Sequence, residues 1–214
     1  MGAFTIVDER ASLVLLGSFN PGIFHPEWLR RVSLATAGET TKNPELMTAE
    51  LTIVPVADLR IEVHLNRLQI TGPAASATRI YELAQGTLER LEHVPVTALG
   101  MNRHTHFQAP DEATWHAVGH NLVPKPVWKN FLDDPRTKSV TVQGKRDGGT
   151  ATMIYITVEP SAQVVPGVHI SVNEHHMIDP HLASVAVEHM AEWQDAQGWS
   201  RRMGEELLTK CSAT

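Results

Sequence analysis

The first half of the chain alternates short apolar runs with turn residues in a way that predicts β-strands. An unbroken apolar run at Leu13–Leu16 ends at Gly17 and predicts a buried strand. Between Leu59 and Leu65, apolar and polar residues alternate, as in an antiparallel strand with one face in the core and one in solvent. Apolar residues then recur every three or four positions from Ile80 to Leu91, which predicts a long amphipathic helix.

The second half repeats this succession of patterns. A strand is predicted from Val96 to Phe107, and a short helix follows Asp111. Three further strands are predicted between residues 140 and 172, the first two joined by a hairpin at 147–149. A final long helix is predicted to begin at Asp179, its N-cap residue, and to reach Leu207.

Both halves therefore read strand, short helix, three strands, long helix. We predict an α+β fold in a single domain of residues 1–214, built from two β-α-β-β-β-α pseudo-repeats at 11–94 and 95–208. The two units would form one curved antiparallel sheet with two long helices packed on one face. An unrepeated α+β domain with the same elements is the alternative.

Three segments, LLGSFNPGIFHPEWL, TALGMNRHTHF and VHISVNEHH, are similar to segments of uncharacterised bacterial proteins of about this length. The order of elements also resembles the duplicated TATA-binding-protein-like and helix-grip arrangements over most of the chain. This resemblance implies a fold and supplies no catalytic residue. In TATA-binding proteins the open sheet face grips DNA, but a shared fold does not carry that function with it.

Charge and composition narrow the classes of function. The 214 residues include 18 Lys and Arg against 24 Asp and Glu, a formal net charge of −6, which argues against a protein that coats nucleic acid or an anionic membrane. The opening residues lack the pattern of a secretory signal, and no apolar run approaches the length of a membrane-spanning helix. With a single cysteine, Cys211, the sequence predicts a cytoplasmic protein.

The 12 histidines are the most reactive feature of the sequence. His104 and His106 lie two apart on a predicted strand, and His116 and His120 lie four apart on the following helix, so each pair shares a face. Together they could hold Zn²⁺ in a metal-dependent hydrolase. If the strand pair faces the open side of the sheet, however, the sheet separates the two pairs and no site forms.

No catalytic motif set accompanies this scaffold, so we expect a non-enzymatic binding or assembly protein without a cofactor. It would act through contacts with a protein partner or with further copies of itself, using exposed aromatic anchors. The candidates for these anchors are Phe24, Trp128 and Trp199. Another alternative is a small-ligand pocket between the sheet and the long helices, lined by Trp115, Tyr155 and Trp193, although these rings could equally fill the core.

Overall fold

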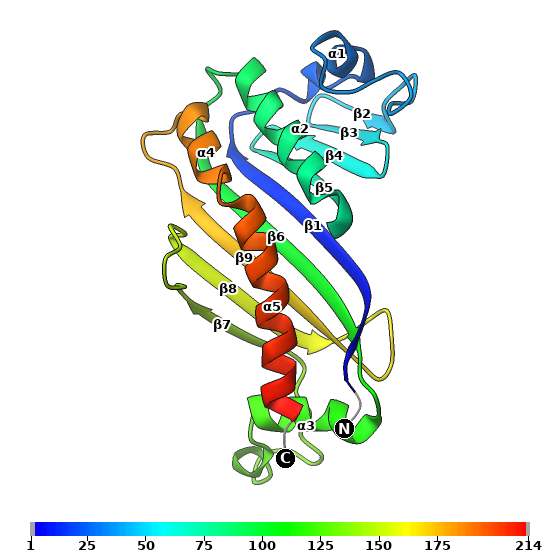
Figure 1. The fold of residues 1–214 in the computed structure, drawn as a ribbon, viewed down its shortest axis with the longest axis vertical. Coiled ribbons are helices and arrows are strands. Elements are labelled where there is room, and N and C mark those ends of the chain that lie inside the picture. Colours follow the sequence, from blue (N-terminus) through cyan, green and yellow to red (C-terminus); the bar gives the residue numbers. More distant parts are fainter. Residues whose placement is uncertain (1–2, 213–214) are drawn as a thin grey trace.

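The computed structural model describes residues 3–212, which form one open antiparallel sheet of nine strands with helices on one face (Figure 1). In spatial order the strands are β2 (Leu46–Met47), β3 (Leu51–Val56), β4 (Leu59–His64), β5 (Arg67–Pro73), β1 (Thr5–Gly17), β6 (Val96–Gln108), β9 (Gly167–Met177), β8 (Met153–Pro160) and β7 (Val140–Gly144). The predicted α+β class with a single antiparallel sheet is confirmed.

The strand order runs symmetrically outward from the central pair, β1 and β6. On one side follow β5, β4 and β3, and on the other β9, β8 and β7. Both central strands are 13 residues long and pair along nearly their whole length. This order is compatible with two repeats at 11–94 and 95–208, while the duplication itself and its boundaries stay predictions.

Three helices cover one face of the sheet, namely α2 (Ala77–Arg90), α4 (Ala183–Met190) and α5 (Trp193–Ser212) (Figure 1). The prediction of one continuous final helix is wrong in two respects. The chain turns at residues 178–182, where the Leu182 N–H donates to Pro180 O, so α4 begins at Ala183 and Asp179 does not cap it. A second turn, closed by the Ala191 N–H donating to Glu188 O, ends α4 before α5 begins.

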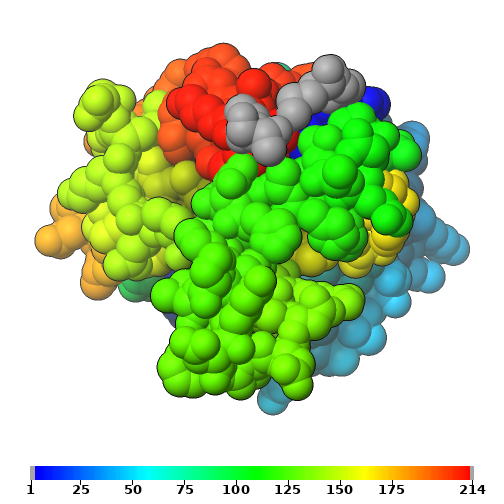
Figure 2. All heavy atoms as spheres, turned by 90° about the horizontal axis from the view of Figure 1, so that it is seen from below, coloured from blue at the N-terminus to red at the C-terminus, as the bar shows by residue number. Residues whose placement is uncertain are grey.

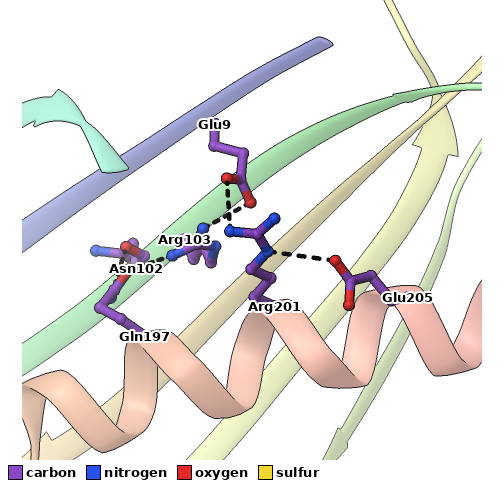
Figure 3. Close-up of polar contacts among 6 residues, drawn as sticks. All are labelled: Glu9, Asn102, Arg103, Gln197, Arg201 and Glu205. Atoms are coloured by element: carbon purple, nitrogen blue, oxygen red, sulfur yellow. Dashed lines mark hydrogen bonds and ion pairs between the residues drawn. The ribbon is translucent and has the colours of Figure 1, made fainter. Parts of the chain in front are cut away.

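A polar contact ties α5 to the two central strands (Figure 3). Arg103 of β6 is only 7% exposed and forms a 2.6 Å ion pair with Glu9 of β1. Gln197 of α5 donates to the backbone oxygen of Asn102 at 3.3 Å. A buried guanidinium is costly without a charged partner. The ion pair between Glu9 and Arg103 therefore links β1 to β6 on the helix side, at the centre of the sheet.

The short helices differ between the two halves. Helix α1 (Pro26–Arg31), which follows the 3₁₀ helix η1 (Pro21–Ile23), contributes Leu29 to the core of the first half. Helix α3 (Glu112–Leu122) instead packs against α5 at the lower end of the molecule (Figure 1). Part of the helix-side surface of β7 and β8 therefore borders a groove rather than a packed helix. Two other 3₁₀ helices are η2 (Ala74–Ser76) and η3 (Lys125–Trp128).

The face of the sheet opposite the helices is polar on the central strands toward the β8–β9 loop. Alternate residues of each strand point to opposite faces, and on β1 the positions Ala11, Leu13 and Leu15 are buried in the helix-side core. The intervening positions of the central strands therefore form the open face. The polar ones are Asp8, Arg10 and Ser12 of β1, Asn102, His104 and His106 of β6, and His169, Ser171 and Asn173 of β9. At the other end of β1 the same face carries Val14 and Leu16.

Candidate functional site

The predicted four-histidine zinc site does not form. His104 and His106 lie on the open face in β6, whereas His116 and His120 are exposed on α3, which packs against α5 on the helix side. Within residues 3–212 no group of three or more His, Cys, Asp or Glu side chains is placed to hold a metal ion. The strand pair thus faces away from the helix pair, as the alternative interpretation required.

The strand pair belongs to a different cluster, whose other members come from β8 and β9. His104 Nδ1 lies 3.3 Å from His169 Nε2, and His169 Nδ1 lies 2.9 Å from a carboxylate oxygen of Glu159. The ring of His106 stacks on that of His169 at a centroid distance of 4.3 Å. We call His104, His106, His169 and Glu159 the histidine cluster.

Sequence reasoning missed His169 and Glu159 because their positions depend on strand register. His169 is directly opposite His106 in the β6–β9 pair and directly opposite Glu159 in the β8–β9 pair. The alternation of buried and exposed positions along β9 could have predicted which face of the sheet His169 occupies. Only the pairing of strands about 60 residues apart brings it to His106.

A loop closes one end of the histidine cluster. The Ser161 hydroxyl lies 2.9 Å from His106 Nδ1, and the same oxygen accepts hydrogen bonds from the backbone N–H groups of Gln163 and Val164. The side chain of Gln163 also donates to Asp8 of β1 at 3.2 Å. The β8–β9 connection is therefore attached to the open face beside the imidazoles.

The environment of the cluster favours the neutral forms of His104 and His106. Burial is the main reason that the pKa values of His104 and His106 are below their ordinary value, and the neighbouring imidazole of His169 is the second. Glu159 opposes the shift of the pKa at both rings, and Asp8 opposes it at His106. Neutral imidazoles can each donate and accept one hydrogen bond, so the cluster can both hold and exchange a proton.

Two hollows lie beside α3 and α5, and the larger one also borders Glu159 of the histidine cluster. The larger, of about 600 Å³, lies beside α3 and is lined by Trp115, His116 and His120 among others. The smaller, of about 400 Å³, is an apolar groove between α5 and the β7–β8 edge, lined by Trp199 and Val142 among others. A hollow therefore does occur between the sheet and a long helix, but with a different lining from the predicted one.

The aromatic candidates occupy four kinds of position. Phe24, expected as an exposed anchor, is 1% exposed and belongs to the core, because it packs with the residues around α1. Trp193, expected in a pocket, is completely buried and donates from Nε1 to Ala77 O at 2.8 Å. Tyr155 is exposed on the open face, away from the helices. Trp115 and Trp199 line the two hollows, and Trp128 is exposed.

Trp128 is part of a larger exposed apolar group at the lower end of the molecule. Val127, Trp128, Phe131 and Leu132 are 66, 46, 79 and 55% exposed, respectively. Backbone N–H groups of Phe131 and Leu132 both donate to Trp128 O, which folds the segment into a compact turn after η3. We call these four side chains the apolar knob. Figure 2 shows the surrounding segment, in green, projecting from this end.

Lys125 fixes the base of the knob. This residue is 7% exposed, and its ammonium group donates to the backbone oxygens of Gly119 and Val123 at the end of α3, at 3.1 and 2.9 Å. It also contacts the hydroxyl of Thr137, on the far side of the knob. Burial lowers the pKa of Lys125, as expected for an ammonium group that has no carboxylate partner among residues 3–212. The knob thus projects from a cross-linked base.

A second set of titratable groups is buried on the helix side of β9. The Glu174 carboxylate is completely buried and lies 3.3 Å from the guanidinium of Arg146, which also pairs with Asp195 of α5 at 2.5 Å. Burial raises the pKa of Glu174, and Arg146 opposes this effect. Two residues along β9, His176 is also completely buried. The contacts of Arg146 with Glu174 and Asp195 hold the β7–β8 loop against α5.

Comparison with known proteins adds no assignment. No protein-family model matches the sequence, and no curated protein matches it either. Within residues 3–212, no helix combines the length and the apolar character that crossing a bilayer requires. The geometry of the surfaces described above therefore carries the functional conclusion.

Proposed function

We propose that the protein is a non-enzymatic binding or assembly module that acts through protein–protein contacts, with the apolar knob as its anchor. The exposure of four large apolar side chains within six residues carries this proposal. Single exposed apolar residues are common on protein surfaces, but a contiguous group rimmed by polar residues is typical of an interaction site. Trp and Phe supply much of the binding energy at such sites.

The anchored base supports the same proposal. Binding energy is lost when a flexible segment must be ordered, at about 0.5–1.5 kcal/mol for each side chain immobilised. The Lys125 contacts to Gly119, Val123 and Thr137 already hold the backbone on both sides of the knob. The knob can therefore enter a partner with little further loss of backbone freedom.

The favoured occupant is an apolar groove of a different protein, and self-association is the alternative. The knob projects, and a projecting surface needs a concave one for close packing. The chain has its own apolar groove beside Trp199, so a second copy could also receive the knob. Such a head-to-tail contact would build rings or filaments, whereas a different partner would leave the isolated protein monomeric.

Site-specific photo-crosslinking tests the proposal in the cells that make the protein. A benzophenone amino acid at Phe131 should give one discrete cross-linked product, identified by mass spectrometry. The matched control is the same probe at Leu65, which is 54% exposed but lies outside the knob. Phe131→Asp should weaken binding of the identified partner by about 30-fold or more, the effect of a buried aromatic anchor.

The outcomes separate the alternatives. A cross-linked product that contains two copies of this chain assigns the knob to self-association. In that case the mass of the purified protein in sedimentation should also rise with its concentration. A product containing another protein assigns it to a partner. Diffuse products of equal yield from positions 131 and 65 would sink the proposal.

A small-ligand function has one observation in its favour, the apolar groove between α5 and the β7–β8 edge. The volume of about 400 Å³ is within the range of small-molecule sites. An apolar fluorescent probe should bind in this groove of the wild type. The Val142→Arg variant should bind the probe more weakly, because a charged side chain would extend from β7 into the groove. Unchanged probe binding by this variant would dismiss the groove as a ligand site.

A further inference from the structure

Arg10 and His104 form an unassigned pair on the open face of the sheet. They are directly opposite each other in the antiparallel β1–β6 register, which places their Cβ atoms about 4.5–5.5 Å apart. Arg10 is exposed, and within residues 3–212 its guanidinium has no hydrogen bond or ion pair. Arg60 on the same face, by contrast, is paired with Glu45 and Glu62. Arg10 therefore presents free donors to solvent beside the histidine cluster.

Hydrogen-bond chemistry determines which nitrogen of His104 carries a proton. The ionised Glu159 carboxylate only accepts hydrogen bonds, so His169 Nδ1, 2.9 Å away, must be the N–H donor. With the His169 ring neutral, its Nε2 is an acceptor and His104 Nδ1, 3.3 Å away, donates to it. In this protonation state His104 Nε2 carries the lone pair. This nitrogen faces away from His169, and no protein donor within residues 3–212 contacts it.

The charges around the pair restrict what it can bind. Asp8 lies two positions from Arg10 on β1, opposite His106, while Glu159 lies three strands away on β8, so Asp8 is the carboxylate nearer the unpaired guanidinium. Asp8 repels a dianion more strongly than a monoanion, and a monoanion can be neutralised by Arg10 alone. The Ser171 hydroxyl, opposite His104 on β9, extends the polar floor of the site.

We propose that Arg10 and His104 bind a small hydroxycarboxylate. The guanidinium of Arg10 holds the carboxylate through two parallel N–H donors, a geometry that suits this group. The hydroxyl of the ligand donates its hydrogen to the lone pair of His104 Nε2. Because the two side chains come from neighbouring strands, the hydroxyl must be close to the carboxylate, as in a 2-hydroxy acid. Glu159 and His169 are positioning residues, since they fix the proton on His104 without touching the ligand.

Glycolate and acetate form the matched probe pair, because they differ only in the hydroxyl group. Titrations of ¹⁵N-labelled protein, followed by NMR at neutral pH, should show glycolate binding about tenfold or more tightly than acetate, the effect of one satisfied hydrogen bond in the site. Arg10→Gln should weaken glycolate binding about tenfold or more. His104→Leu should reduce the glycolate-to-acetate preference to about one. Arg60→Gln, which removes a paired arginine from the same face, should change neither affinity.

The proton assignment has its own measurement. The ¹⁵N shifts of the imidazoles should show an N–H at Nδ1 and a lone pair at Nε2 for both His104 and His169, and this observation does not depend on any variant folding. An N–H at His104 Nε2 overturns the proposal. So do equal affinities for glycolate and acetate in the wild type, tighter binding of hydrogen phosphate than of glycolate, or unchanged binding by Arg10→Gln. All these outcomes are independent of the knob.

Discussion

Replacing His176 with leucine tests how a buried imidazole makes the stability of the fold depend on pH. His176 is completely buried on β9, and neither ring nitrogen has a hydrogen-bond partner within residues 3–212. Burial, and secondly His189 of α4 at a centroid distance of 5.2 Å, lower the pKa of His176 to about 4. His175 and Arg146 act in the same direction, and only Glu192 opposes them.

The size of the effect follows from the difference in pKa. In the unfolded chain an imidazole has its ordinary pKa of about 6.5, so the unfolded state takes up a proton well before the folded state does as the pH falls. The stability that neutral His176 contributes is therefore complete above about pH 6.5 and decreases as the pH falls toward 4. With 1.36 kcal/mol for each pKa unit, the total loss is about 3 kcal/mol, most of which has occurred at pH 4.5.

Urea denaturation of the wild type and His176→Leu at pH 7 and pH 4.5 measures this contribution. Leucine is similar in size to histidine and has no polar atoms, so at pH 7 the variant should be at least as stable as the wild type. At pH 4.5 it should be more stable by a further ~2–3 kcal/mol. His93→Gln, at a side chain 94% exposed, is the control and should show no such change.

Two results would refute this reasoning. One is a stability difference between His176→Leu and the wild type that stays the same at both pH values. The other is a loss of more than about 2 kcal/mol at pH 7, which is the cost expected if the ring nitrogens were hydrogen-bonded in the folded protein.

Three further predictions concern stability and can be measured by urea denaturation at neutral pH. Arg146→Met should cost about 3–5 kcal/mol because it leaves the buried Glu174 carboxylate without its cation, and adding Glu174→Gln should restore part of the loss; an unaffected midpoint in the single variant would contradict the pairing. Asp111→Ala should cost about 1 kcal/mol, since Asp111 accepts from the Thr114 N–H at the start of α3, and full stability would mean that the cap contributes nothing. Gly17→Ala should cost about 1–3 kcal/mol, because a Cβ at this position would lie 2.3 Å from Pro95 O; a neutral result would show that the backbone yields easily there.

Local patterns in the sequence predicted most of the elements, because a strand with one buried face and a helix with one buried face leave different periods. The alternation from Leu59 to His64 matches β4, and the apolar stripe around Leu83 matches α2. The break between α4 and α5 was missed, since Met190 and Trp193 are both buried and therefore continue an apolar stripe across the break. Only packing on the sheet separates the two helices.

The sites were less predictable, because they depend on contacts between distant segments. Alternation correctly placed His104 and His106 on one face, but His169 joins them through a pairing that no local pattern encodes. Aromatic residues gave no signal of exposure by themselves, as Phe24 is in the core while Trp128 is in the knob. Val127 and Phe131, like Trp128 and Leu132, are four residues apart, which is the spacing of a buried helix face, so the pattern did not reveal that these side chains are exposed.

The central position of β1 has a consequence for synthesis on the ribosome. Its partner β6 ends at Gln108, so β1 emerges from the exit tunnel about 90 residues before the last of the chain with which it pairs. During that interval β5 and α2 can assemble on one side of β1, while its other edge stays open along 13 residues. Open strand edges promote pairing with other chains. The nascent first half is therefore the stage at which this protein is most prone to aggregate, and slowing translation between residues 90 and 108 should lower the yield of folded protein.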